Sequence, residues 1–259
     1  MTIELPRDRY GRPLILQADG STKPYTRASQ VGDTLDDKSA LQAWGERMVV
    51  KGVVESDHVR RLISLADISD DKGLGAIARK AKDAAGAWSA SDLGTAIHKM
   101  TERIDTGAMS VDDVTPEFRP HITAYLAARD AYGLRPVLVE ATVVDDDLEI
   151  AGTADRIYEC RDGRRIVGDL KTGKSIFLPS KSIGCQLAAY AHSRLYDPET
   201  GERTDIEGLR TDIAYVIHLP ANGSGCTLYE VDVTRGYELC GLAQTVRRVR
   251  NERLIRPHE

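Results

Sequence analysis

The sequence predicts an α/β (α+β) fold, in which helices fill the N-terminal half and a mixed central sheet flanked by helices fills the C-terminal half. Between residues 41 and 131, apolar side chains recur at spacings of three and four, which is the period of an amphipathic helix. After Pro136 the pattern changes to alternation of apolar and polar residues, which is the period of a half-buried strand. We therefore expect a helical N-terminal layer on a central sheet, in one compact unit.

The N-terminal half is expected to be helical after a short lead-in. The first forty residues are polar and rich in turn formers, so we expect an extended, partly ordered segment over 1–40. A helical part over 41–135 follows. Its helices are expected at 41–54, 56–69, 74–87, 89–104 and 115–131.

The C-terminal part, over 136–259, is expected to contain the sheet. Strands are expected at 137–144, 148–159 and 164–172. Turn residues at 145–147 and 162–163 join them, so the three strands should form an antiparallel meander. The remaining expected elements are a helix at 182–195, strands at 212–219 and 226–233, and a basic amphipathic helix at 236–254.

Composition limits the possible classes of protein. The formal net charge of -5 argues mildly against nucleic-acid binding, although a site that holds divalent cations must itself contain carboxylates. The four cysteines contain no C-x-x-C pair, so zinc ribbons are not expected. The chain shows no basic leader followed by an apolar run and no apolar stretch of membrane-spanning length. We expect a soluble, cytoplasmic protein without membrane contact.

The segment Gly168-Asp-Leu-Lys-Thr-Gly-Lys-Ser175 fits two chemical signatures. One is a P-loop, G-x-x-x-x-G-K-S, which needs a following helix whose first amides face phosphate groups. Pro179 would end such a helix within about one turn of Lys174. The tight hairpins before this strand also favour antiparallel pairing over the parallel strands of nucleotide-binding folds. A P-loop protein, with Lys174 as its essential lysine, remains the alternative interpretation.

The other signature is a metal-dependent nuclease. Residues i and i+2 of a strand point to the same face, so Asp169 and Lys171 should point together into one site. The hairpin turn at 162–163 should bring Asp155 on the partner strand beside them, within reach of one cation. A carboxylate-bound cation activates water, and a lysine stabilises the negative charge that develops on phosphate.

Four motifs in order then resemble a known family. They are Gly94-Thr-Ala-Ile-His98, Gly152-Thr-Ala-Asp155, Asp169-Leu-Lys171 and Gln186-Leu-Ala-Ala-Tyr190. Together they resemble the RecB-like branch of the PD-(D/E)XK nucleases, which includes phage exonucleases and CRISPR-associated nucleases. The resemblance implies a restriction-endonuclease-like core.

The resemblance also implies roles for individual residues. The metal ligands, for Mg2+ or Mn2+, would be His98, Asp155, Asp169 and the backbone carbonyl of Leu170, and the catalytic lysine would be Lys171. Similar nucleases often have an acid at the position of Glu140, which makes this residue a further candidate for the catalytic set. Gln186, Tyr190 and Lys174 are candidates for contact with nucleic acid.

Some of these residues have ordinary structural explanations. His98 lies at the border of the apolar stripe of its helix, where many histidines serve only as interface residues. Gln186 and Tyr190 share a helical face, so they either brace the active-site strands or contact the nucleic acid. Gly152 indicates either a strand bulge or a close approach of the substrate backbone.

The expected function is hydrolysis of DNA, and the resemblance favours exonuclease action on DNA ends in phage-type recombination or repair. The iron-sulfur members place a cysteine before the nuclease motifs, but Cys160 lies between Asp155 and Asp169, so no iron-sulfur cluster is expected. Expected partners are the DNA substrate and a single-strand-annealing or recombination protein, and an oligomer is compatible with the sequence. If the chain is phage-encoded, its location is the host cytoplasm. A non-catalytic DNA-binding module on a nuclease fold is the remaining alternative.

Overall fold

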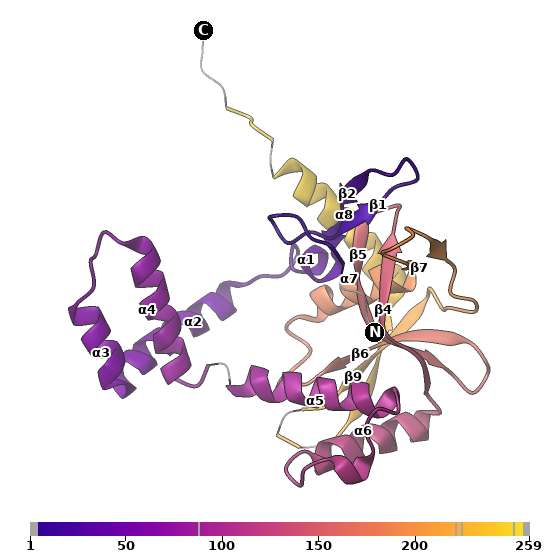
Figure 1. The fold of residues 1–259 in the computed structure, drawn as a ribbon, viewed down its shortest axis with the longest axis horizontal. Coiled ribbons are helices and arrows are strands. Elements are labelled where there is room, and N and C mark those ends of the chain that lie inside the picture. The colour runs from indigo at the N-terminus through magenta and orange to yellow at the C-terminus, as the bar shows by residue number, and fades with distance from the viewer. Residues whose placement is uncertain (1–4, 88, 221, 224, 251, 256–259) are drawn as a thin grey trace. The chain divides into compact units, whose positions relative to one another are not determined.

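The computed structural model describes residues 5–87, 89–220, 222–223, 225–250 and 252–255 (Figure 1). By the contacts among its residues, the chain divides into two compact units. The larger unit comprises residues 1–36 and 97–259, and the smaller unit comprises residues 37–96. These boundaries differ from the single compact unit, with divisions at 40 and 135, that the sequence led us to expect.

Helices form the smaller unit. They are α2 (Ser39–Glu55), α3 (Asp57–Ser64), α4 (Asp71–Ala84) and the first part of α5 (Ser89–Asp105). Helices α2 and α4 approach closely at Gly52, where a Cβ atom would lie 1.8 Å from the carbonyl oxygen of Ala81. Only glycine permits this contact between helices.

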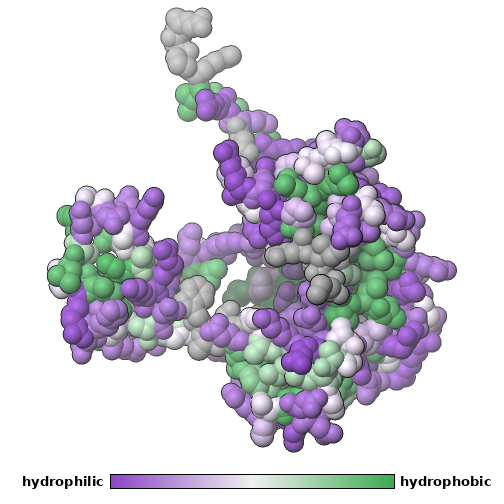
Figure 2. Space-filling view, in the orientation of Figure 1, coloured by the Kyte–Doolittle hydropathy of each residue, from purple (hydrophilic) through white to green (hydrophobic). Residues whose placement is uncertain are grey.

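The smaller unit also exposes large apolar side chains. Figure 2 shows hydrophobic surface on these helices, beside the hydrophilic residues that cover the rest of the unit. The exposed residues include Leu41, Val50, Val54, Leu65 and Ile68. The apolar stripes that predicted helices over 41–87 are therefore only partly buried within this unit.

The larger unit is built on a mixed sheet. Its strands are β3 (Thr26–Arg27), β4 (Arg135–Asp145), β5 (Ile150–Glu159), β6 (Arg165–Lys171), β7 (Arg194–Tyr196), β8 (Arg203–Thr204), β9 (Ile213–His218) and β10 (Thr227–Asp232). The spatial order is β10-β9-β6-β5-β4-β7-β8, and β3 pairs with β5. The pairs β6–β9 and β3–β5 are parallel and the others are antiparallel, so the expected mixed sheet is confirmed.

The central three strands form the expected antiparallel meander. Strand β4 pairs with β5, and β5 pairs with β6 in a register that sets Arg156 opposite Gly168 and Ile157 opposite Val167. The same register places Asp155 level with Asp169. Alternation along these strands buries Ile157, Val167 and their neighbours in the core on one side.

Helices flank the central strands of the sheet. Helix α7 (Ser180–Ala191) packs on β4, β5, β6, β9 and β10, and α8 (Val233–Val249) and the short α1 (Ala28–Gly32) pack on α7. Helix α6 (Arg119–Tyr132) lies beside α5 (Figure 1), and both Tyr125 and Arg129 bond to Asp105 of α5. A short 3-10 helix, η1 (Val111–Asp113), lies between them in the chain.

The expected lead-in over 1–40 contains ordered elements among its described residues. Strands β1 (Leu14–Leu16) and β2 (Thr22–Pro24) form a hairpin, β3 joins the main sheet, and α1 packs on α7. The helix expected at 182–195 ends at Ala191, and the chain continues into edge strand β7, which pairs with β4. None of the helices that the structure describes combines the length and apolar character needed to cross a membrane.

Candidate metal and active site

Two acids and a lysine meet on neighbouring strands. Asp169 and Lys171 lie on β6, and the Lys171 Nζ atom is 2.7 Å from Oδ2 of Asp169. On β5, Oδ2 of Asp155 accepts a hydrogen bond from the backbone N–H of Leu170 at 3.2 Å. The hairpin register therefore does bring the two acids and the lysine side by side.

A histidine from helix α5 completes this arrangement. The Nε2 atom of His98 lies 2.9 Å from Oδ2 of Asp155 and 3.3 Å from the carbonyl oxygen of Leu170. Three atoms that commonly ligate metals, an imidazole nitrogen, a carboxylate oxygen and a backbone carbonyl oxygen, thus lie around one point. His98 is partly buried, as the border position of its helix predicted.

Glu140 on β4 belongs to the same cluster. Ligand atoms of His98, Glu140 and Asp155 all lie within 4.8 Å of one another. In the register of β4 and β5, Val139 pairs with Arg156 and Ala141 with Ala154, so Glu140 stands level with Asp155. Glu140 has a φ of 52°, a left-handed conformation that is unusual for a residue other than glycine, and such strain is common at functional sites.

The electrostatics of the cluster follow from burial and from its two ion pairs. Burial, and then the charge of Asp155, raise the pKa of Asp169 to about 6. Burial also favours the neutral form of Asp155, but the His98 hydrogen bond and charge, with Lys171, outweigh it and lower the pKa of Asp155. Burial disfavours the charged forms of His98 and Lys171, yet the neighbouring carboxylates raise the pKa of both.

Glu140 behaves differently because its positive neighbours are farther away. Burial, followed by the negative charges of Asp155 and Glu102, raises the pKa of Glu140 to about 7. Its nearest cation is Arg156, whose Nη1 atom is 3.8 Å from Oε1. The cluster therefore contains more negative charge than its own cations neutralise.

The donor set fits a divalent cation. Asp169 is buried, and its Oδ1 atom has no hydrogen-bond partner among the residues that the structure describes. A buried carboxylate oxygen without a partner is costly unless a cation or a proton binds it. The carboxylate and carbonyl oxygens suit Mg2+ or Mn2+, and the imidazole adds a ligand of the kind that transition metals take.

The comparison with protein families agrees with this geometry. Residues 80–218 match the family model of the PD-(D/E)XK nuclease superfamily, which is more than half of the chain. The chain belongs to this superfamily. The matched segment runs from α4 to the end of β9 and includes the helix of His98 and all three strands of the meander. No curated protein matches the chain.

Membership in the PD-(D/E)XK superfamily indicates a metal-dependent nuclease and restriction-endonuclease-like architecture. This membership agrees with the cluster of an imidazole, carboxylates and a lysine in the candidate site. Nucleases of this superfamily use divalent metal ions, and the group of His98, Glu140 and Asp155 is the candidate site in the described chain.

Helix α7 packs against the strands of this candidate site. The Nε2 atom of Gln186 donates a hydrogen bond to the Tyr190 hydroxyl at 3.2 Å, and Tyr190 is buried. A Cβ atom at Gly152 would lie 2.8 Å from the Tyr190 ring. Gly152 thus makes room for this ring and not for a substrate backbone, and the burial of Tyr190 favours the bracing alternative over contact with nucleic acid.

The loop after β6 does not have the form of a P-loop. Strand β6 ends at Lys171 and the next helix, α7, begins at Ser180, so Lys174 does not start a helix. The carbonyl of Gly173 instead accepts a hydrogen bond from Nε2 of His218 at 2.7 Å. Lys174 is exposed, outside the cluster around Asp155.

Sequence reasoning missed one buried charge network beside the site. Arg156 is almost completely buried, and its Nε atom donates to Oδ2 of Asp105 at 2.6 Å. Its Nη1 atom donates to the carbonyl oxygen of Asp155 at 2.7 Å. The signal in the sequence is weak: a single arginine, between Asp155 and Ile157, in a strand whose other residues include Ile150, Ala151 and Ala154.

Proposed function

We propose that the protein is a Mg2+- or Mn2+-dependent deoxyribonuclease that hydrolyses phosphodiester bonds. The observation that carries this proposal is the convergence of His98, Asp155 and the Asp169–Lys171 pair at one point of the sheet. In this proposal the cation is held by His98, Asp155, Asp169 and the Leu170 carbonyl. Glu140 contributes a further carboxylate from β4.

Each side chain then has a chemical task. A divalent cation, when bound, lowers the pKa of water and offsets charge on the scissile phosphate. Lys171, held beside Asp169, directs its ammonium toward the phosphate oxygens and stabilises the charge that they gain in the transition state. Because this lysine is partly buried, its ammonium acts in a medium of lower dielectric than water, where such an interaction is stronger.

Exonuclease action on DNA ends, in recombination or repair, is the finer form of the proposal. It rests on the order of the motifs from His98 to Tyr190, which resembles the RecB-like branch. A single-strand-annealing or recombination protein is the proposed partner, and the proposed location is the cytoplasm.

Hydrolysis of labelled linear and circular DNA tests the proposal. Linear DNA should be lost with Mg2+ or Mn2+, EDTA should stop the reaction, and intact circular DNA should persist if the enzyme needs ends. Asp169→Ala should abolish the activity, and Asp205→Ala, which removes an exposed aspartate outside the cluster, should not. Unchanged cleavage by Asp169→Ala would reject the assignment of the site.

A further inference from the structure

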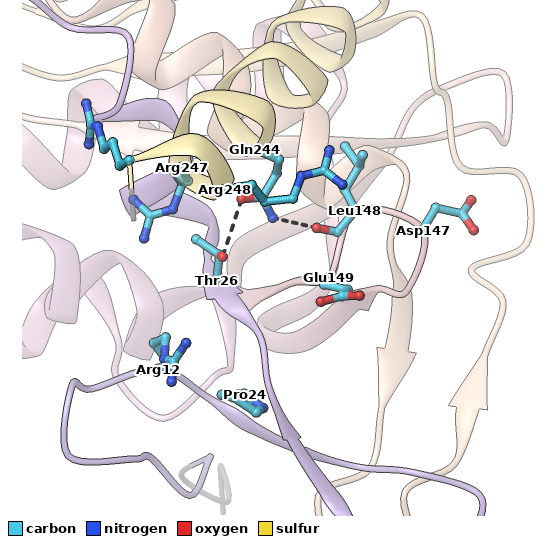
Figure 3. A pocket seen from close by; sticks show the side chains of 10 residues that line it. Arg12, Pro24, Thr26, Asp147, Leu148, Glu149, Gln244, Arg247 and Arg248 are labelled. Carbon is cyan, nitrogen blue, oxygen red and sulfur yellow. Dashed lines mark hydrogen bonds between the residues drawn. The ribbon is translucent and has the colours of Figure 1, made fainter. Parts of the chain in front are cut away.

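A cavity lined by arginines lies at the start of strand β5, and the candidate nuclease site lies farther along the same strand. Its volume is about 480 Å³, and it is bounded by the end of α8, the β4–β5 turn and the N-terminal strands (Figure 3). Four arginines line it: Arg12, Arg247, Arg248 and Arg250. This concentration of positive charge stands out in a chain whose formal net charge is -5.

The positive charge of the cavity is largely uncompensated. Within the described residues, the guanidinium groups of Arg247, Arg248 and Arg250 form no ion pair with a carboxylate. Arg12 is paired with Asp8 at 2.7 Å. The helix dipole of α8 explains basic residues in its last turn, but it does not explain a fourth arginine that comes from a different segment.

The two acids on the rim do not neutralise these arginines. Glu149 is already paired with Lys23, whose Nζ atom is 2.8 Å from Oε1. Asp147 is exposed, and Figure 3 shows its carboxylate pointing away from Arg12 and Arg247. The cavity therefore presents cations to whatever enters it.

Hydrogen bonds between neutral groups fix the position of Gln244, which lines the cavity. Gln244 of α8 donates through Nε2 to the carbonyl oxygen of Leu148 at 2.5 Å, and its Oε1 atom accepts from the Thr26 hydroxyl at 3.4 Å (Figure 3). Arg247 is half-buried, and its Nη1 atom reaches the Gln30 carbonyl oxygen and the Thr34 hydroxyl only at 3.4 Å. Burial, and then the charges of Arg250 and Arg12, lower the pKa of Arg247, which is the effect of like charges facing one another without an anion.

Planar guanidinium groups of this kind bind phosphate with two parallel hydrogen bonds. Strand β5 relates the cavity to the nuclease site: Asp155 lies six positions after Glu149, which is roughly 20 Å at about 3.3 Å per residue. At about 3.4 Å per base pair, that separation corresponds to roughly six base pairs of duplex DNA. A duplex cut at Asp155 and extending toward α8 thus has backbone phosphates at the right distance.

We propose that the arginine cavity is a second, non-catalytic site that binds backbone phosphates of the DNA substrate, about six base pairs from the point of cleavage. This inference rests on the proposed function as a DNA nuclease. The cavity adds affinity for substrates that are long enough to reach it, and takes no part in hydrolysis.

The test compares the triple variant Arg247→Gln/Arg248→Gln/Arg250→Gln with wild type on two duplexes, one the stem of a hairpin of about five base pairs and one of about twenty base pairs, a choice set by the rise of B-DNA. Fluorescence anisotropy in EDTA measures binding without cleavage. The variant should bind the long duplex about tenfold or more weakly, with a salt slope reduced by roughly two to three, because each lost phosphate contact removes about 0.9 from that slope. In Mg2+, KM for the long duplex should rise while kcat, and KM for the short duplex, stay the same.

The matched control is Arg235→Gln, which removes an arginine from the other end of α8, where it pairs with Glu238. It should leave the KM for the long duplex unchanged. Arg248→Gln alone, at an exposed position, serves if the triple variant fails to fold, and it should give a smaller change of the same kind.

Three results would overturn the inference. The first is an unchanged affinity and salt slope for the long duplex in the variants, while wild type binds and cuts DNA; the proposed function then stands without the second site. The second is binding of inorganic phosphate, abolished by the triple variant, with no change in DNA affinity, which would assign the cavity to a small anion. The third is wild-type protein that binds no DNA, which would reject the proposed function together with this inference.

Discussion

Asp155 and Asp169 each have an ion-pair partner within the site. His98 lies against Asp155, and Lys171 lies against Asp169. The raised pKa of His98 extends the pH range in which its imidazole is protonated, and a protonated imidazole cannot ligate a metal. Cation affinity should therefore increase with pH as His98 loses its proton.

Glu140 gives a prediction about stability in the absence of metal. Its folded-state pKa of about 7 lies above the ordinary value of 4.5, so the folded protein holds this proton more tightly than the unfolded chain. The stability that this provides is complete below pH 4.5 and is lost as pH rises through 7. Glu140→Gln cannot ionise, and it should be more stable than wild type at pH 8 by about 1–3 kcal/mol.

Urea unfolding in EDTA at pH 8 and at pH 5 measures this difference, which should nearly vanish at the lower pH. Glu199→Gln, at an exposed loop position, is the matched control and should show no pH-dependent difference. Equal stability of Glu140→Gln and wild type at pH 8 would contradict the burial of a charged Glu140.

The two lysines after Gly168 give a second prediction. Lys171 is paired with Asp169 within the site, whereas Lys174 is exposed in the following loop. Lys171→Ala should lower kcat by about 100-fold or more, because it removes a group that stabilises transition-state charge. Lys174→Ala should change kcat little and at most weaken DNA binding; the reverse order of effects, measured by steady-state hydrolysis of linear DNA, would favour the P-loop interpretation.

At the scale of single residues, the spacing of residues along the strands predicted which acids and which lysine lie together. The i, i+2 rule placed Asp169 and Lys171 together, and the hairpin turn at 162–163 placed Asp155 beside them. The sequence did not reveal the positive φ of Glu140 or that Tyr190 would fill the space above Gly152. Both depend on packing between segments that are far apart in the chain.

At the scale of elements, a buried ion pair fixes α5 to the sheet. Arg156 of β5 bonds to Asp105 of α5, and Asp105 also accepts from Tyr125 and Arg129 of α6. The Tyr158 hydroxyl lies 2.9 Å from that of Tyr125. Because His98 is two turns before Asp105 on α5, this network determines where the imidazole meets Asp155.

Arg156→Met should therefore be strongly destabilising. The substitution leaves the carboxylate of Asp105, which is fully buried, with only part of its compensation, and such a change costs about 3–5 kcal/mol. Adding Asp105→Asn removes the stranded charge and should restore part of the loss. Arg135→Met breaks an exposed ion pair with Glu159 on the same sheet and should cost at most about 1 kcal/mol.

Guanidinium chloride unfolding curves of the three variants measure these costs. A similar small loss for Arg156→Met and Arg135→Met would show that the buried pair does not hold α5 in place. Metal affinity should fall in Arg156→Met as well, since His98 loses its fixed position relative to Asp155.

Helices and strands were predicted best where a regular hydrophobic pattern extended over the length typical of that element. The meander β4–β5–β6 and helices α2, α4 and α5 follow from period and turn residues alone. The short strands β3, β7 and β8 were not predicted, because two or three residues carry no measurable period. Such short strands form only where a neighbouring strand has an unpaired edge with which they can form hydrogen bonds.

At the scale of the whole molecule, net charge proved a poor guide to the distribution of charge. The formal value of -5 hides an acidic cluster around Asp155 and a basic cavity at the end of α8. Carboxylates gather where a cation is expected, and arginines gather where a phosphate is expected. A chain that binds cations and phosphates at separate places needs no overall basic charge.

The cluster around Asp155 also predicts how a divalent cation affects the stability of the whole fold. A ligand that binds only the folded state stabilises it by about 2.7 kcal/mol at one hundred times its Kd, which raises Tm by roughly 5–10 °C for a protein of this size. Mg2+ or Mn2+ should therefore raise Tm, and EDTA should reverse the change. Asp155→Ala should remove the shift, and Asp205→Ala, outside the cluster, should retain it. Differential scanning fluorimetry at pH 7.5–8 measures it without DNA; an equal shift in Asp155→Ala would place the cation elsewhere and leave the two acids without their proposed role.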